Sequence, residues 1–69
     1  MSGDFFSPSW LFSDEYLDAR IFQEEQGDWA LEISREGYTL DDLRGFPTFD
    51  AAQSLLFTLH PGMMEVSHE

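Results

Sequence analysis

The sequence predicts an α+β fold in which a three-stranded antiparallel sheet packs against one C-terminal helix. Two observations predict the sheet: apolar and polar residues alternate over 29–34, and glycines at 27 and 37 flank this stretch where tight turns are needed. A third predicts the helix, because apolar residues recur at helical spacing between 49 and 60. With 69 residues, we expect one domain, residues 1–69.

Residues 1–16 form an N-terminal aromatic segment that is predicted to be partly helical. Ser7 can cap a short helix with Pro8 at its first position, and Ser13 is a second candidate cap. We expect one or two helical turns whose aromatic side chains fold back on the core. These side chains are Phe5, Phe6, Trp10 and Phe12.

Residues 17–44 are predicted to form the three-stranded meander. The first strand, 17–24, is close to period two, although a helix also fits because Leu17 and Ile21 lie four apart. The second strand covers 29–34 and the third covers 38–40, with an extension to Leu43 left open, and turns lie at 25–28 and 35–37. The side chains expected to face the helix are Ile21, Trp29, Leu31, Ile33, Tyr38 and Leu40.

Residues 48–60 are predicted to form the helix. Thr48 is a suitable N-cap and Asp50 suits the first turn, while Pro61 and the following glycine end the helix. Residues 61–69 are expected to be a tail. The apolar helix face is predicted to consist of Phe49, Ala52, Leu55, Leu56 and Leu59.

Charge is the most informative property of the composition. Fourteen Asp and Glu residues stand against three Arg and no Lys, a formal net charge of −11. This argues against direct binding to nucleic acid or to an anionic membrane, since both need cations on the protein. It does not indicate disorder, because 42% of the residues are hydrophobic and 16% are aromatic. The excess acid opposes folding by self-repulsion, so a role other than stability is expected for it.

The chain contains no Cys, and its first residues have no basic stretch followed by an apolar run. Disulfides, thiolate metal sites and a secretory signal are therefore not expected. No stretch approaches the ~20 apolar residues of a membrane span. We expect a protein of the host-cell cytoplasm.

The predicted pairing places Asp18, Glu24 and Glu32 on the sheet face away from the helix, with Asp41 as a further candidate. The turns add more acids at the rim, and the side of Asp42 is left open. Alternate strand residues lie roughly 6.6 Å apart, and phosphates along one DNA strand lie ~3.4 Å apart in axial rise. A row of carboxylates could therefore replace a row of phosphates. A merely solvated face is the competing explanation, but acids barely interleaved with bases favour a basic partner.

Phe22 falls among these acids and is either an exposed interface anchor or packed beneath the N-terminal aromatics. With it, the predicted partner-binding residues are Asp18, Phe22, Glu24, Glu25, Asp28, Glu32, Glu36, Asp41 and Asp42.

The sequence predicts no metal site, no cofactor and no catalytic site. The acidic turn at 24–28 and the adjacent pair at 41–42 do not match a calcium loop. A catalytic carboxylate pair needs a cleft that shifts its pKa values apart, which a domain of this size hardly offers. His60 is expected to suit the helix C-terminus. Arg20, Arg35 and Arg44 are expected to form local ion pairs.

A short, lysine-free, aromatic-rich chain with an acidic middle at 18–42 resembles the phage-encoded anti-CRISPR proteins. Within them it is most similar in character to the acidic inhibitors of type I (Cascade) systems that mimic double-stranded DNA. The resemblance implies a non-catalytic inhibitor that binds the basic groove where the surveillance complex meets target DNA or reads the PAM. It assigns no individual residue.

Two other functions fit the same composition. An antitoxin or immunity protein would neutralise a basic, nuclease-like toxin. A structural or regulatory interaction module would instead use the aromatic N-terminus and the methionines at 63 and 64 as its interface.

Overall fold

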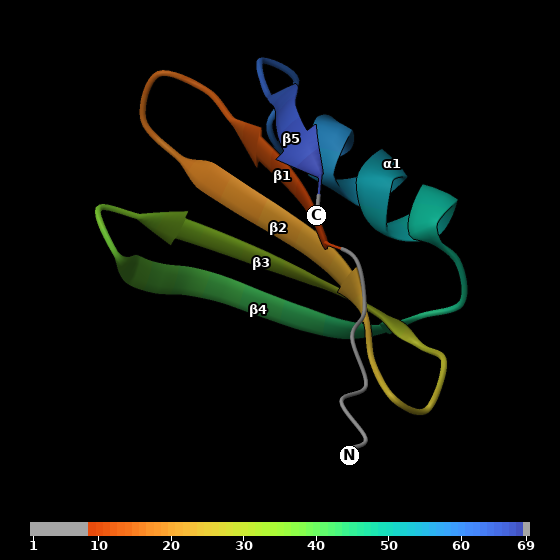
Figure 1. Ribbon diagram of the computed structural model, residues 1–69. Coiled ribbons are helices and arrows are strands. Elements are labelled where there is room, and N and C mark those ends of the chain that lie inside the picture. Colours follow the sequence, from red (N-terminus) through yellow and green to blue (C-terminus); the bar gives the residue numbers. More distant parts are fainter. Residues whose placement is uncertain (1–8, 69) are drawn as a thin grey trace.

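The computed structural model describes residues 9–68, and of 67 and 68 it describes the backbone only. One antiparallel sheet and one helix make up this part of the chain (Figure 1). The elements are β1 (Ser9–Ser13), β2 (Asp18–Gln23), β3 (Trp29–Arg35), β4 (Tyr38–Phe46), α1 (Phe49–Leu59) and β5 (Met64–His68). The strand order is β4-β3-β2-β1-β5, so α1 connects one sheet edge to the other and packs on β2, β3 and β4.

The α+β class and the C-terminal helix are confirmed, but the prediction of three strands is wrong because the sheet has five. Residues 9–13 pair with β2 as a strand, so Ser13 ends β1 and caps no helix. Residues 64–68 pair with β1 where a tail was expected. The helix predicted at Ser7 lies outside the described residues.

The three predicted strands exist, and β2 is a strand rather than the rival helix. The β3–β4 turn places Glu36 at φ 51° and Gly37 at φ 86°. Two successive residues with positive φ suit a two-residue hairpin turn, whose twist matches that of the strands.

A register irregularity in β4 changes which side chains face the helix. Ile33 pairs with Asp41 while Ser34 pairs with Thr39, so Leu40 has no partner of its own. One extra residue turns every following side chain to the other face. Leu40 is this extra residue and is 54% exposed, so its predicted core position is wrong. Tyr38 precedes the bulge and pairs with Arg35 at the end of the sheet, where it is 75% exposed, so its predicted contact with the helix is wrong as well.

A second irregularity in β4 follows at Gly45, where the backbone has φ 86°. Leu31 pairs with Leu43, and two residues earlier on β3 Trp29 pairs with Phe46, so β4 carries one extra residue here too. Glycine adopts this positive φ without the steric penalty of a side chain. The bulge places Phe46 on the helix side of the sheet, because it is opposite Trp29.

Helix α1 begins as predicted. Thr48 has an extended backbone, and its hydroxyl oxygen accepts a hydrogen bond from the Ala51 N–H at 3.1 Å. Ala52 and Leu56 are fully buried, but the core position predicted for Leu59 is wrong, since it is 49% exposed.

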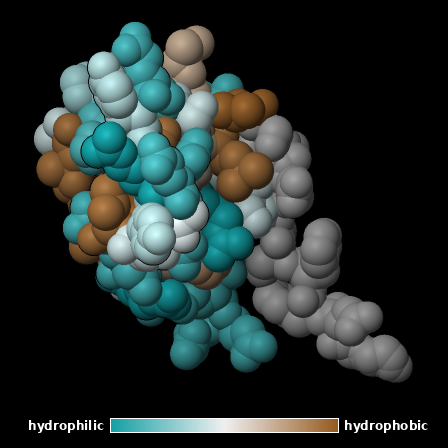
Figure 2. All heavy atoms as spheres, turned by 90° about the vertical axis from the view of Figure 1, so that its left-hand side faces the viewer, coloured by the Kyte–Doolittle hydropathy of each residue, from teal (hydrophilic) through white to brown (hydrophobic). Residues whose placement is uncertain are grey.

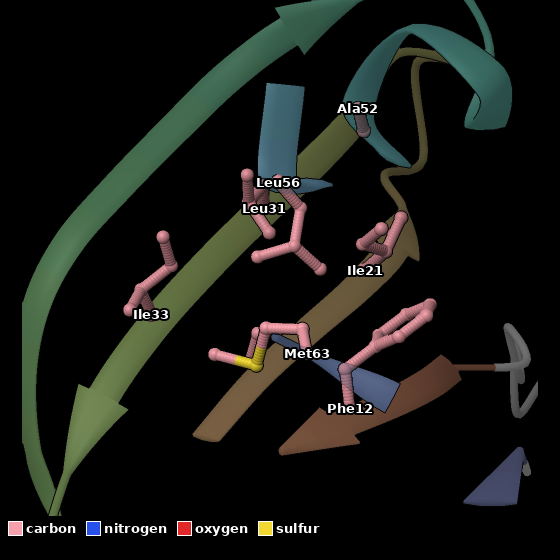
Figure 3. Close-up of a cluster of buried hydrophobic side chains, with 8 residues drawn as sticks. Phe12, Ile21, Leu31, Ile33, Ala52, Leu56 and Met63 are labelled. Carbon is pink, nitrogen blue, oxygen red and sulfur yellow. The ribbon is translucent and has the colours of Figure 1, made fainter. Parts of the chain in front are cut away.

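The core lies between α1 and the helix side of the sheet (Figure 3). Phe12 is fully buried and packs edge-on against Phe57, with ring centroids 5.8 Å apart. Trp10, Trp29 and Phe49 form a second cluster with centroids 4.9–5.8 Å apart. The aromatics of β1 therefore fold onto the core, as expected. The buried core side chains are Phe12, Ala19, Ile21, Leu31, Ile33, Ala52, Leu56 and Met63.

Candidate functional site

The sheet face opposite α1 is covered by no element of the described residues, and we call it the open face. The register places Arg20, Glu32 and Asp42 side by side across β2, β3 and β4. Asp42 thus joins this face and Asp41 does not, because Asp41 pairs with Ile33 on the helix side. The charged and aromatic side chains of the open face are Asp18, Arg20, Phe22, Glu24, Glu32, Asp42 and Arg44, beside smaller and apolar ones such as Leu11 and Ala30.

Two arginines hold three of these carboxylates. Arg44 donates to both carboxylate oxygens of Asp42, at 3.0 and 3.3 Å, and also pairs with Glu24. Arg20 pairs with Glu32 at 3.2 Å. The hydrogen bonds and charge of Asp42, followed by the charge of Glu24, raise the pKa of Arg44 above its ordinary value. The expected ion pairs of Arg20 and Arg44 are confirmed.

This network corrects the expected row of carboxylates. Along β2, Arg20 stands between Asp18 and the half-buried Phe22, so acidic side chains do not follow one another at every second residue. The middle of the open face is therefore a cluster of three carboxylates and two guanidinium groups, whose field is weaker than that of carboxylates alone.

Phe22 is half-buried rather than fully exposed, and Phe5 and Phe6, two of the aromatics expected to cover it, lie outside the described residues. The Phe22 ring lies beneath the guanidinium of Arg20, 4.4 Å from ring centroid to Cζ, with the Cζ of Arg44 at 5.9 Å. Both distances are in the range of cation–π contacts. Trp10 and Phe12 lie on the opposite face of the sheet, since they pair with Ile21 and Ala19.

The remaining predicted acids lie where strands end. Within residues 9–68, Asp18, Glu25, Asp28 and Glu36 form no ion pair with an arginine. Glu25 and Asp28 belong to the β2–β3 turn at one end of the sheet, and the others lie at the opposite end. We call that opposite end, at the β1–β2 and β3–β4 turns, the acidic end; its carboxylates are Asp14, Glu15, Asp18, Glu36 and Glu65.

The acidic end carries a mixed surface (Figure 2). The view onto this end shows mostly hydrophilic atoms, with hydrophobic patches beside them. Arg35 also lies at this end, and no ion pair joins it to any carboxylate among residues 9–68. The ion pair predicted for Arg35 is therefore absent from this part of the chain.

Asp14 shapes the β1–β2 turn. Its Oδ1 accepts hydrogen bonds from the backbone N–H groups of Tyr16, at 2.8 Å, and Leu17, at 2.7 Å. These bonds, helped by the charge of His60, lower the pKa of Asp14 below its ordinary value. The turn is thus built on an ionised carboxylate.

A groove of about 730 Å³ opens beside this turn, between it and β5. The sequence did not indicate this groove, because residues 64–68 were expected to be a tail and no pattern marks an edge strand of five residues. The groove is lined by Ser13, Asp14, Glu15, Tyr16, Gly62, Met64, Glu65 and Val66.

Among residues 9–68, no three Asp, Glu or His side chains are grouped where they could hold one metal ion. The helix in this part of the chain is too short and too polar to cross a membrane. No family model matches the chain, and comparison with curated proteins and with solved structures found no similar one.

Proposed function

We propose that this protein is a non-catalytic inhibitor that occupies a cationic, nucleic-acid-binding surface of another protein in place of nucleic acid. We further propose that this surface is the DNA-binding or PAM-binding surface of a type I CRISPR-Cas surveillance complex. One observation carries the first proposal: two of the three arginines are used inside the sheet's open face, and within residues 9–68 the acids at its ends form no ion pair with an arginine.

The free carboxylates favour a cationic partner because their own chain does not neutralise them. The net charge of −11 produces a long-range attraction toward any surface rich in Lys and Arg. Such attraction speeds encounter and weakens as salt is added.

The acids are held on short, hydrogen-bonded turns. The Glu24 N–H donates to the Asp28 carbonyl at 2.7 Å, and Asp14 holds the β1–β2 turn. Turns whose backbone is fixed before binding lose little conformational entropy when a partner engages their side chains. This supports recognition of a preformed cationic surface.

The distance between the two ends also suits a DNA-binding surface. Seven residues separate Asp18 from Glu25, which is about 23 Å at a strand rise of ~3.3 Å. Phosphates along one strand of DNA advance by ~3.4 Å, so the two ends match roughly seven phosphate steps. We infer two points of contact with the arginine-paired open face between them, rather than a continuous track of carboxylates.

The choice of a type I surveillance complex rests on the whole-chain resemblance to acidic anti-CRISPR proteins. The direct test is to add the purified chain to purified type I complexes and measure target-DNA binding by gel shift. We expect the chain to block DNA binding at low salt, less at high salt, and to restore plating of a targeted phage.

DNA binding that is unchanged by excess chain would contradict the CRISPR assignment. Rescue of cells from a basic nuclease toxin, without any effect on phage plating, would assign the chain to the antitoxins instead. Failure of the chain to bind either partner at low salt would contradict the cationic-partner proposal itself.

A further inference from the structure

The groove beside β5 combines three properties that the proposed function leaves unused. The first is apolar surface. Tyr16, Met64 and Val66 line it and are 70%, 72% and 63% exposed. Single exposed apolar residues are ordinary, but three that line one groove form a patch on which another molecule can bury apolar surface.

The second property is an open strand edge. β5 pairs with β1 on one side and is the last strand of the described sheet on the other. The outer side of an edge strand presents backbone N–H and C=O groups to which an extended peptide can hydrogen-bond. β4 is the other edge, but its pairing with β3 is interrupted twice, against once for β5 with β1.

The third property is charge. Asp14, Glu15 and Glu65 line the groove beside the apolar side chains. A second copy of the chain is a poor occupant, because each copy carries a net charge of −11. An occupant that is itself cationic gains attraction where a second copy meets repulsion.

We infer that the β5 groove binds an extended basic segment of a partner protein, which adds to the sheet as a strand beside β5. Side chains of a strand point alternately to opposite sides, so a segment that alternates basic and apolar residues fits best. Its cations meet the three carboxylates, and its apolar side chains meet Tyr16 and Met64. This inference specifies how the partner in the proposed function would be bound. It rests on the proposed function only for the partner's positive charge.

The probe for this inference is a labelled synthetic peptide of about seven residues that alternates arginine and valine, long enough to span β5 at a ~3.3 Å rise. Its binding to the full chain is followed by fluorescence anisotropy, and the contacted backbone by NMR shifts. A second peptide of the same sequence carries N-methyl groups on alternate backbone nitrogens. It keeps the charge and loses hydrogen bonds to a strand edge.

We expect the first peptide to bind, to shift the resonances of residues 14–16 and 64–66, and to bind at least about tenfold more tightly than the N-methylated one. The joint change Tyr16→Ser and Met64→Ser is expected to weaken binding about tenfold. Tyr38→Ser with Leu40→Ser is the matched control, since these exposed apolar side chains lie on β4 at the other edge. It is expected to leave binding unchanged.

Three results would overturn the inference: no binding, equal binding of both peptides, or NMR shifts confined to β4. Concentration-dependent self-association through β5, detected by sedimentation, would also overturn it by making a second copy the occupant. Because the peptide assay needs no surveillance complex or toxin, its failure leaves the proposed function standing if the chain still blocks DNA binding.

Discussion

The two faces of the sheet are held together by different forces. The face toward α1 buries apolar side chains such as Leu31 and Leu56, both fully buried. On the open face, Arg20 and Arg44 lie over Phe22 and pair with the surrounding carboxylates. Burial of apolar area is the main source of folding free energy, whereas exposed ion pairs contribute little.

This difference between the two faces indicates which residues of so acidic a chain can serve binding. The core alone can hold the fold, so charged groups on the outside are free to serve binding. The two arginines sit where the acids of three strands meet, and they relieve repulsion there. The acids at the strand ends are left to attract a partner. The position of the few cations, more than the count of acids, therefore locates the candidate site.

The largest expected effect is on the helix side. Leu56→Ala leaves a cavity in the core and is expected to lower the free energy of unfolding by about 2–5 kcal/mol. Leu59→Ala, on the same helix but half exposed, is the matched control and should lower it by less than about 1 kcal/mol. Urea unfolding followed by circular dichroism measures both. Equal losses would show that the core is not where we place it.

Removal of the Arg44 cation from the open face is expected to have a smaller effect on stability. Arg44→Met keeps packing against Phe22 but leaves Glu24 and Asp42 without a cation, so repulsion between them lowers the melting temperature. The drop should be smaller than that of Leu56→Ala. Arg35→Met removes the same charge at a site without an ion pair in the described chain, and should lower the melting temperature less. A larger drop for Arg35→Met would contradict the assigned network.

The salt dependence of the melting temperature tests the same comparison between the two faces. Raising NaCl from about 0.02 M to about 0.5 M shortens the Debye length and screens repulsion among the acids. The melting temperature of the protein should therefore rise, and that of Arg44→Met should rise more, because more of its repulsion is unrelieved. A melting temperature that falls with salt would mean that ion pairs outweigh repulsion.

The smallest effect concerns Asp14. Its pKa is lowered in the fold, so its stabilisation is fully present above the unfolded value of ~3.9 and is lost as pH falls through the lower folded pKa. Asp14→Ala should therefore be less stable than the unchanged protein at pH 7. This difference should shrink in acid below the folded pKa, because the protonated carboxyl keeps only a neutral acceptor oxygen for the Tyr16 and Leu17 N–H groups. Asp14→Asn keeps an acceptor oxygen and should lie between them. A difference that is the same at both pH values would contradict the role of the ionised carboxylate.

Much of the fold follows from sequence pattern. The alternation around Leu31, the hairpin glycines and the Thr48 cap each act over a few residues, and each is confirmed. β1 and β5 were missed because short strands are stabilised by partners distant in the sequence. Residues 64–68 become a strand only because α1 delivers them to β1.

The candidate site was predicted less well than the fold. The placement of Asp18, Glu24 and Glu32 on the open face agrees with the structure, since their positions follow from alternation alone. Asp41 was placed on the wrong side of the sheet because nothing in the sequence pattern around Leu40 indicates a bulge. Arg44 was not expected to reach Glu24, which lies twenty residues earlier in the chain. That contact depends on the register of three strands.

The most direct measurement compares two sets of neutral substitutions that remove the same charge. One variant combines Asp18→Asn, Glu25→Gln and Glu36→Gln at the strand ends, and the other combines Glu24→Gln, Glu32→Gln and Asp42→Asn in the paired open face. Both are checked for folding by circular dichroism and assayed for inhibition of DNA binding by a type I surveillance complex. Our account predicts that the first loses inhibition by about tenfold or more and the second by less than about threefold. Equal losses, or a greater loss from the open face, would contradict it.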